Sequence, residues 1–281
     1  MSESETPLSV VVGVDGSRAA VRAAVWAVDE AVSRDIPMRL VHVLDDETER
    51  APTQSASGQA VLHEAQAAAE ATGKPVKIEM EIAHGRPLAT LVQASRSAEM
   101  VCVGPIGVRQ ATAKVGSTAS GLVSSAHSPV AVVRAHDGPG HPTDGWVVVE
   151  ADDSPANNAV LQRGVEEARL RGGRLRVITA WQPRFTDIHE DNAVTDGNRR
   201  VRAQLDRRLA HWTRRHPELE IRSVAVHGTI LNYLAKHADS VQLVVVGKSL
   251  SGDAQELVGP AGHAALQQTD CSVLVVCPRY L

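Results

Sequence analysis

Aromatic side chains are scarce in this chain: only 2% of its 281 residues are Phe, Trp or Tyr. A core without many large rings has to be built from Val, Ala, Leu and Ile. Long apolar runs are also missing, because no segment approaches the ~20 residues that cross a bilayer as a helix. The sequence therefore predicts a globular fold without a membrane insertion.

Neither sign of charge dominates the composition. The chain has 29 Lys and Arg against 33 Asp and Glu, which gives a net charge of -4 with neutral histidines. Such a balance offers no general attraction to nucleic acid or to an anionic membrane. We therefore expect neither as a partner. The first six residues are polar and acidic, and they lack the basic and apolar regions of a signal peptide.

Cysteine is also rare. Cys102, Cys271 and Cys277 all lie in or beside Val-rich segments. An odd number of buried thiols argues against a disulfide scaffold and suits a reducing cytoplasm, which is the expected location. A redox pair of Cys271 and Cys277 is the alternative to small apolar core residues. No Cys-x2-Cys or His-x3-His spacing indicates a structural zinc site.

Apolar strands alternate with amphipathic helices along the first part of the chain. The hydrophobic pattern predicts strands at 8–14, 38–44, 76–82, 100–103 and 129–133. Helices are predicted from the Ser17 cap to Arg34 and at 57–72, 87–97 and 117–126, with a loop over 45–56. This alternation predicts an α/β fold with a parallel sheet wrapped by helices.

The same pattern restarts near residue 146. Trp146 to Ala151 repeats the first strand, and Asp152-Asp153-Ser154 stands where Asp15-Gly16-Ser17 stood. A repeat of this length indicates two homologous domains rather than a solenoid. We expect two tandem doubly wound domains, each with a five-stranded parallel-type sheet flanked by helices. Their predicted limits are 1–135, a linker over 136–145, and 146–281.

Two segments of domain 1 combine the parts of a mononucleotide pocket. Residues 11–17 read Val-Val-Gly-Val-Asp-Gly-Ser, and residues 103–107 read Val-Gly-Pro-Ile-Gly, followed eight residues later by Gly116-Ser117. Gly104 and Gly107 can take positive φ and let backbone amides approach phosphate oxygens. The helix that begins at Ser117 adds partial positive charge. The alternative is that these glycines only make turns.

On these motifs the chain resembles the tandem-domain universal stress proteins of actinobacteria, over nearly its full length. The family pattern is Gly-x2-Gly, nine residues, then Gly-Ser/Thr; here the spacer has eight, and Pro105 removes one amide. The resemblance implies an ATP site that can take Mg²⁺ together with the nucleotide, and a regulatory role in stress or dormancy through an unknown protein partner. It also implies that the strands at 129–133 and 272–276 meet as an intrachain pseudo-dimer; association of two chains into a homodimer stays open.

The nucleotide site implied by this resemblance lies in domain 1. Asp15 is expected near the ribose hydroxyls or a metal, and Val43 near the adenine edge. Arg109 and Lys114 either reach the phosphates or are solvated. The expected nucleotide-binding residues are Val14, Asp15, Gly16, Ser17, Val43, Gly104, Ile106, Gly107, Gly116, Ser117 and Thr118.

Domain 2 departs from this pattern. Leu250 replaces Gly107, Pro260 replaces Ser117, and Asp153 replaces Gly16. These changes remove backbone freedom and donors and add negative charge near the expected phosphates. We therefore expect weak or absent nucleotide binding in domain 2 and a structural role.

Other features leave alternatives open. No triad, carboxylate pair or reactive cysteine indicates a catalyst, so enzymatic activity is at most slow ATP hydrolysis. A nucleotide-free scaffold that acts through protein partners is the competing function. The acidic clusters at 45–47 and 189–191 are either metal ligands or solvated loop tips. The seven arginines over 198–216 lie on either a solvated helix face or a partner surface.

Overall fold

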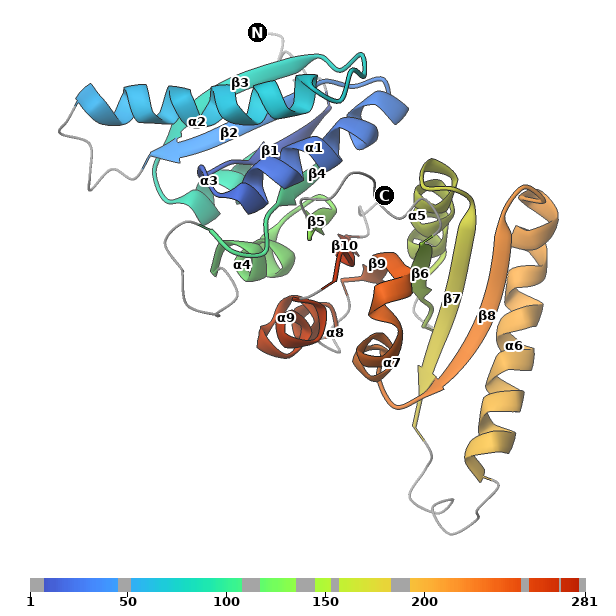
Figure 1. The fold of residues 1–281 in the computed structure, drawn as a ribbon. Helices are drawn as coiled ribbons and strands as arrows, with labels where there is room; N and C mark the ends of the chain where they lie inside the picture. The colour runs from blue at the N-terminus through green and yellow to red at the C-terminus, as the bar shows by residue number, and fades with distance from the viewer. Residues whose placement is uncertain are drawn as a thin grey trace, which may run out of the picture.

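The computed structural model describes residues 8–44, 52–107, 117–134, 145–152, 157–182, 193–248, 253–267 and 269–277. Two α/β halves lie side by side, and their sheets meet at the centre of the molecule (Figure 1). We call residues 8–134 the first half and residues 145–277 the second half. Within the described residues, no helix combines the length and apolar character needed to cross a bilayer.

The first half follows the predicted alternation. Its strands are β1 (Ser9–Gly13), β2 (Met38–Leu44), β3 (Ile78–His84), β4 (Ala98–Val103) and β5 (Val130–Val132). Its helices are α1 (Arg18–Ser33), α2 (Pro52–Glu70), α3 (Pro87–Ala94) and α4 (Ser117–Ser125).

Several boundaries differ from the sequence prediction, and two of them have a local physical reason. The predicted loop over 45–56 is wrong from Pro52 onward, because α2 begins there; proline fits the first turn of a helix, where its missing N–H is not needed. The third strand begins at Ile78 rather than Val76. Val76 is still in a turn, where its amide donates to the carbonyl of Lys74 at 2.9 Å.

The second half repeats the order of the first. Its strands are β6 (Trp146–Glu150), β7 (Arg174–Trp181), β8 (Glu220–His227), β9 (Val241–Gly247) and β10 (Ser272–Val276). Its helices are α5 (Asn157–Leu170), α6 (Ala193–Arg215), α7 (Ile230–His237), α8 (Asp253–Val258) and α9 (Pro260–Leu266).

All ten strands form one sheet in the order β3-β2-β1-β4-β5-β10-β9-β6-β7-β8. Pairing is parallel inside each half, and β5 pairs with β10 antiparallel, with Val132 opposite Val273 and Val130 opposite Val275. The α/β fold with two repeats is therefore confirmed, and the two final strands meet as expected. The two five-stranded sheets are continuous with each other.

The central strands are buried on both faces. In β1, Val10 and Val12 face α1 and α2, while Val11 faces the opposite layer with Leu91 and Leu122. Small residues such as Ala23, Ala27 and Ala31 let α1 pack closely on the sheet, which fits a core with few aromatic rings. The cysteines are free and buried, and burial raises the pKa of Cys271 to about 12.

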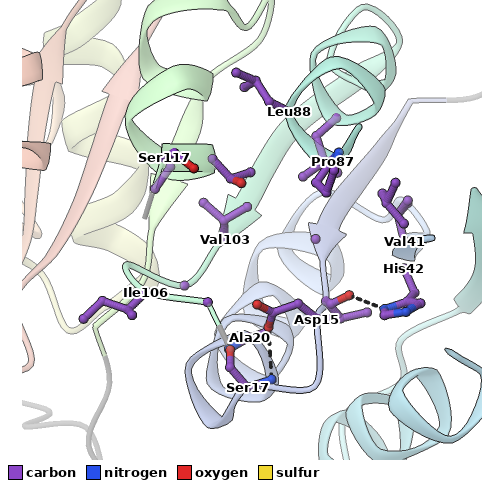
Figure 2. A pocket seen from close by; sticks show the side chains of 18 of the residues that line it. Asp15, Ser17, Ala20, Val41, His42, Pro87, Leu88, Val103, Ile106 and Ser117 are labelled. Atoms are coloured by element: carbon purple, nitrogen blue, oxygen red, sulfur yellow. Dashed lines mark hydrogen bonds between the residues drawn. The ribbon is translucent and has the colours of Figure 1, made fainter. Parts of the chain in front are cut away.

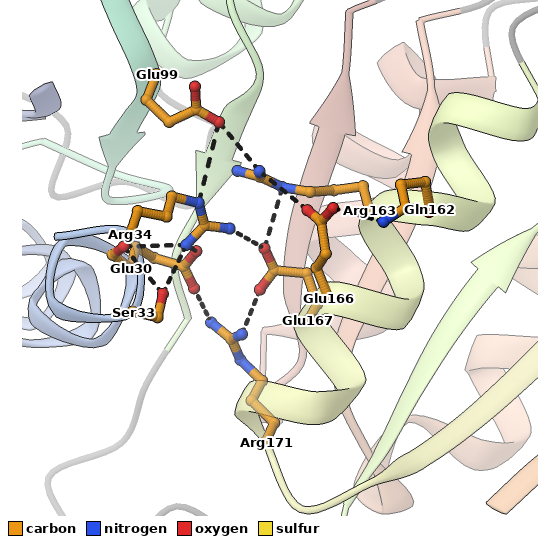
Figure 3. Close-up of polar contacts among 9 residues, drawn as sticks. All are labelled: Glu30, Ser33, Arg34, Glu99, Gln162, Arg163, Glu166, Glu167 and Arg171. Atoms are coloured by element: carbon orange, nitrogen blue, oxygen red, sulfur yellow. Dashed lines mark hydrogen bonds and ion pairs between the residues drawn. The ribbon is translucent and has the colours of Figure 1, made fainter. Parts of the chain in front are cut away.

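A buried ion cluster joins the halves on one face of the sheet (Figure 3). Glu30 of α1 and Arg34 just after this helix meet Glu167 of α5 and Arg171 just after that helix, which occupy the same positions 137 residues later. Arg34 reaches Glu30 at 2.8 Å and Glu167 at 3.1 Å, and Arg171 pairs with the same two carboxylates. Each arginine thus holds one carboxylate from its own half and one from the other.

The two carboxyls of this cluster are fully buried and behave differently. Burial and the charge of Glu30 raise the pKa of Glu167 to about 7, against the opposing charges of Arg171, Arg163 and Arg34. Burial also pushes the Glu30 carboxyl upward, but Arg171, Arg34 and Arg163 outweigh it and lower its pKa. Glu30 therefore ionises first as the pH rises.

Candidate functional site

A pocket opens where β1, β2 and β4 end at their carboxyl edge (Figure 2). Its volume is about 580 Å³, within the usual range for small-molecule sites. The lining comes from these strand ends and from the first turns of α1, α3 and α4. It comprises Gly13, Val14, Asp15, Ser17, Ala20, Val41, His42, Val43, Leu44, Arg86, Pro87, Leu88, Leu91, Val103, Gly104, Ile106, Gly107, Ser117, Thr118 and Ala119.

The turn after β1 places polar groups at the pocket. The amide of Ser17 donates to Oδ1 of Asp15 at 3.0 Å, and Oγ of Ser17 accepts from the amide of Ala20 at 3.1 Å, which caps α1. Gly16 has a φ of +83°, a conformation that favours glycine, and it does not itself line the pocket. Gly16 thus makes the turn that presents Asp15.

The glycines after β4 let two stretches of backbone approach each other closely, and they do not have a positive φ. Neither Gly104 nor Gly107 has a positive φ, so the predicted reason for them is wrong. A Cβ on Gly107 would lie 2.4 Å from Oδ2 of Asp15, and a Cβ on Gly104 would lie 2.7 Å from the Cβ of Ala19. Only glycine lets this loop pass so near the turn after β1. The loop and the turn are therefore fitted to each other.

His42 fixes the position of the same turn from β2. Its Nδ1 lies 2.8 Å from the carbonyl oxygen of Val14, and because that oxygen only accepts, Nδ1 carries the proton and donates. Gly58 of α2 packs against the ring, since a Cβ there would be 3.0 Å from Cδ2. His42 therefore both lines the pocket and holds the turn after β1.

The opposite wall is apolar and was not predicted in full. Val41, Leu91 and Val103 are buried, and Leu88 of α3 is partly buried beside them. Pro87 fixes the start of α3 at this wall, in agreement with the predicted helix start. The sequence signal was present in the alternation of β2 and in the Pro87–Leu91 spacing, but only the sheet order brings these segments together.

The structure brings most predicted site residues together at this pocket: Val14, Asp15, Ser17, Val43, Gly104, Ile106, Gly107, Ser117 and Thr118. Gly116 lies outside the described residues, as do Arg109, Lys114 and the acidic clusters at 45–47 and 189–191. Among the residues that are described, no group of three or more His, Cys, Asp or Glu could hold a metal ion.

At the equivalent edge of the second half, two side chains make contacts that the first half does not share. Trp181 stands where the first half has Leu44, and its Nε1 donates to Oδ1 of Asn198 at 2.7 Å. The ring lies against Gly197, where a Cβ would be 2.0 Å from it. Arg208 of α6 donates to the carbonyl of Asp152 at 2.8 Å. Asp153 and Leu250 lie outside the described residues, and Pro260 begins α9 where Ser117 begins α4.

Comparison with known proteins gives consistent matches along the whole chain. The model of the universal stress protein family matches residues 8–134 and again residues 146–277. The universal stress proteins Rv2028c and Rv3134c of Mycobacterium tuberculosis are each 43% identical to it, over 100% and 98% of both chains respectively. The crystal structure of a universal stress protein from Archaeoglobus fulgidus has a similar fold, with a TM-score of 0.69, 17% identity and 96% of each chain covered.

Proposed function

Because the chain belongs to the universal stress protein family, we propose that the pocket of its first half binds an adenine nucleotide, ATP with Mg²⁺, as part of a regulatory role in stress or dormancy. The single observation that carries this proposal is the fit between Gly107 and Asp15, where no side chain larger than hydrogen has room. Such a close approach leaves the backbone of the glycine loop bare toward the pocket, as phosphate recognition requires.

The two walls of the pocket suit the two ends of a nucleotide. Val41, Leu88, Leu91 and Val103 offer an apolar slot for a flat base. Ser117 and Thr118, at the first turn of α4, and the loop from Gly104 to Gly107 offer amides and hydroxyls for phosphate oxygens. Between them, Asp15 is suited to accept hydrogen bonds from ribose hydroxyls. The arrangement thus supports a ligand with an apolar ring at one end and an anion at the other.

Magnesium fits the chemistry of the same site. Mg²⁺ prefers oxygen ligands and usually binds through one or two carboxylates together with substrate phosphates. The carboxylate of Asp15 and the hydroxyl of Ser17 are the oxygen groups of the β1 turn. They would hold a hydrated Mg²⁺ that neutralises the phosphate charge, without further protein ligands.

The second half has a structural role in this proposal. Residues 1–135 form the nucleotide-binding domain, 136–145 the linker, and 146–281 a domain that has lost the site. Trp181 and Arg208 support this assignment, because they bond to Asn198 and to the carbonyl of Asp152 at the edge that corresponds to the pocket of the first half. A bound nucleotide would order the surface around 105–117 and present it to a protein partner.

Calorimetry of the full chain with ATP and Mg²⁺ tests the assignment. We expect one site per chain. Gly107→Ala should weaken the affinity by at least about tenfold, because one lost charge-assisted hydrogen bond alone costs about 1.5–3 kcal/mol. The matched control is Gly247→Ala, at the position of Gly104 in the second half, where an added Cβ meets Val160 at a tolerable 3.2 Å and should leave ATP binding unchanged.

Circular dichroism has to show that both variants are folded. Equal affinity of Gly107→Ala and wild type would contradict the assignment of the pocket. No heat from the folded wild-type chain at millimolar ATP would favour the competing function, a nucleotide-free scaffold acting through protein partners.

A further inference from the structure

Three arginines surround one tryptophan at the opposite edge of the second half. Trp146 is the first residue of β6, and the guanidinium carbons of Arg176, Arg174 and Arg222 lie 4.2, 4.6 and 5.0 Å from its ring centroid. Any two of these charges are therefore within about 10 Å of each other, the screening length at 0.1 M salt. Trp146 is buried beneath them, while Arg222 is exposed. We call these four residues the arginine cluster.

The strand register places like charges directly opposite each other in this cluster. Arg176 of β7 is the cross-strand partner of Arg222 in β8, and Arg174 is opposite Glu220. Opposite charges across a pair of strands stabilise a sheet, whereas like charges destabilise it. The Arg176–Arg222 pair is therefore unfavourable unless a negative group compensates it.

The described residues supply only one carboxylate to this cluster. Glu220 accepts from Nε of Arg174 at 3.1 Å and also pairs with Arg222, so two arginines share it. Arg176 donates to the neutral hydroxyl of Tyr233 in α7, and none of the ion pairs between described residues includes it. Among the described residues, Glu220 thus pairs with Arg222 but not with Arg176, so the like-charged Arg176–Arg222 pair has one carboxylate.

The first half arranges the same positions differently. Arg39 stands where the second half has Arg176, but its cross-strand partner is Glu79, and Glu81 lies 3.5 Å from its guanidinium. Ser9 takes the place of Trp146. An acid opposite arginine is the balanced arrangement. The second half has arginine in place of this acid and a ring on which the guanidinium groups stack.

We propose that the arginine cluster is a binding site for a phosphate-type oxyanion, either free phosphate or a phosphoryl group on a larger molecule. Stacking on a ring occupies the face of a guanidinium and leaves its in-plane N–H groups for an anion. A carboxylate is matched by one arginine through two hydrogen bonds, whereas a tetrahedral phosphate can accept from several arginines at once. This site lies at the amino ends of β6 and β7, away from the pocket at the carboxyl ends of β1, β2 and β4.

The indole N–H signals of the full-length chain test this proposal. The chain has four tryptophans, and Trp146→Phe identifies the signal of Trp146 in a ¹⁵N–¹H spectrum. Inorganic phosphate is added at constant ionic strength, with acetate as the carboxylate arm and a phosphoserine peptide as the arm for a larger carrier. The Trp146 signal should shift saturably with phosphate and at least about tenfold more weakly with acetate.

Two variants and two matched controls make the result decisive. Arg222→Glu restores the acid-opposite-arginine arrangement of the first half, so it should keep the fold and weaken phosphate binding by at least about tenfold; Arg176→Gln should do the same. Arg39→Gln, the equivalent change in the first half, and Gly107→Ala, in the nucleotide pocket, should leave the shift of Trp146 within about twofold of wild type.

The outcomes separate cleanly. Saturation by phosphate alone assigns a free anion, and tighter saturation by the phosphoserine peptide assigns a phosphorylated partner. The absence of a saturable shift with either probe would overturn the proposal, as would equal binding to wild type and a folded Arg222→Glu variant. Neither result depends on whether ATP binds in the first half.

Discussion

The two halves share their fold and their mutual contact but differ at both edges of the sheet. At the carboxyl edge, the first half leaves a pocket around Asp15, whereas at the corresponding edge of the second half Trp181 bonds to Asn198 and Arg208 to the carbonyl of Asp152. At the amino edge, Arg39 faces Glu79 in the first half and Arg176 faces Arg222 in the second. The difference teaches that sheet and helix packing tolerate little change, while the strand ends are free to take up different chemistry.

The contact between the halves shows the opposite behaviour. Glu30 and Arg34 recur as Glu167 and Arg171, and each arginine pairs with both carboxylates. Burying a charge without a partner lowers the free energy of unfolding. None of these four side chains can therefore be replaced alone without destabilising the fold. Equivalent positions of the two halves thus carry the same residue types at the contact between the halves and different residue types at the strand ends.

The largest effect is expected from breaking this contact with Arg171→Ala. Arg171 pairs with both fully buried carboxylates and also stacks on Trp26, 4.6 Å from the ring centroid. Removing it should lower the free energy of unfolding by about 3–5 kcal/mol, because two buried carboxylates lose a partner. Chemical denaturation at pH 7 measures this loss.

Arg34→Ala is the matched change in the first half. Its side chain is 18% exposed against 11% for Arg171, and no ring stacking is seen for it among the described residues, so we expect a smaller loss. A loss below about 1 kcal/mol for Arg171→Ala would mean that the cluster behaves like a surface ion pair.

A second prediction separates the two equivalent carboxyls by pH. Glu167→Gln removes a group whose pKa is raised to about 7, and Glu30→Gln removes one whose pKa is lowered. A raised pKa contributes stability below the unfolded value of 4.5, and this contribution is lost as the pH rises to 7. A lowered pKa contributes stability above 4.5, and this contribution is lost as the pH falls.

The stability of Glu167→Gln relative to wild type should therefore rise between pH 4.5 and 7, by on the order of a few kcal/mol. Glu30→Gln should be clearly less stable than wild type at pH 7. Denaturation midpoints at several pH values measure both curves. Identical curves for the two variants would show that the cluster treats its two halves alike.

The smallest effect concerns the packing of α1 and α5 on their strands. Gly164 of α5 takes the position of Ala27 in α1, and a Cβ on Gly164 would lie 2.1 Å from Cγ2 of Val149. Gly164→Ala should therefore destabilise the chain by about 1–3 kcal/mol through overpacking. Ala27→Gly should cost about 1 kcal/mol, because it loosens a helix and removes a buried methyl group. A thermal melt of each variant tests this, and stabilisation by Gly164→Ala would show that α5 sits farther from β6.

Much of the fold could be predicted because its information is local. Apolar runs and caps such as Ser17 located most elements of the first half, and the repeat indicated a second, similar unit. Asp15, Gly104 and Gly107 could be placed at the pocket from their motifs, although the positive φ predicted for the two glycines was wrong. Arg176 opposite Arg222 could not be found, since strand register is set by long-range pairing. Trp181 was likewise missed as the residue at the second edge, because a ring at a strand end has no local signal.

The antiparallel pairing of β5 with β10 has a consequence for how the molecule responds to dilution and to mutation. Both strands belong to one polypeptide, so their pairing is intramolecular and does not depend on protein concentration. In a symmetric assembly of identical chains every substitution appears on both sides, whereas here it appears once. A single gene can therefore carry two differently specialised surfaces at a fixed one-to-one ratio.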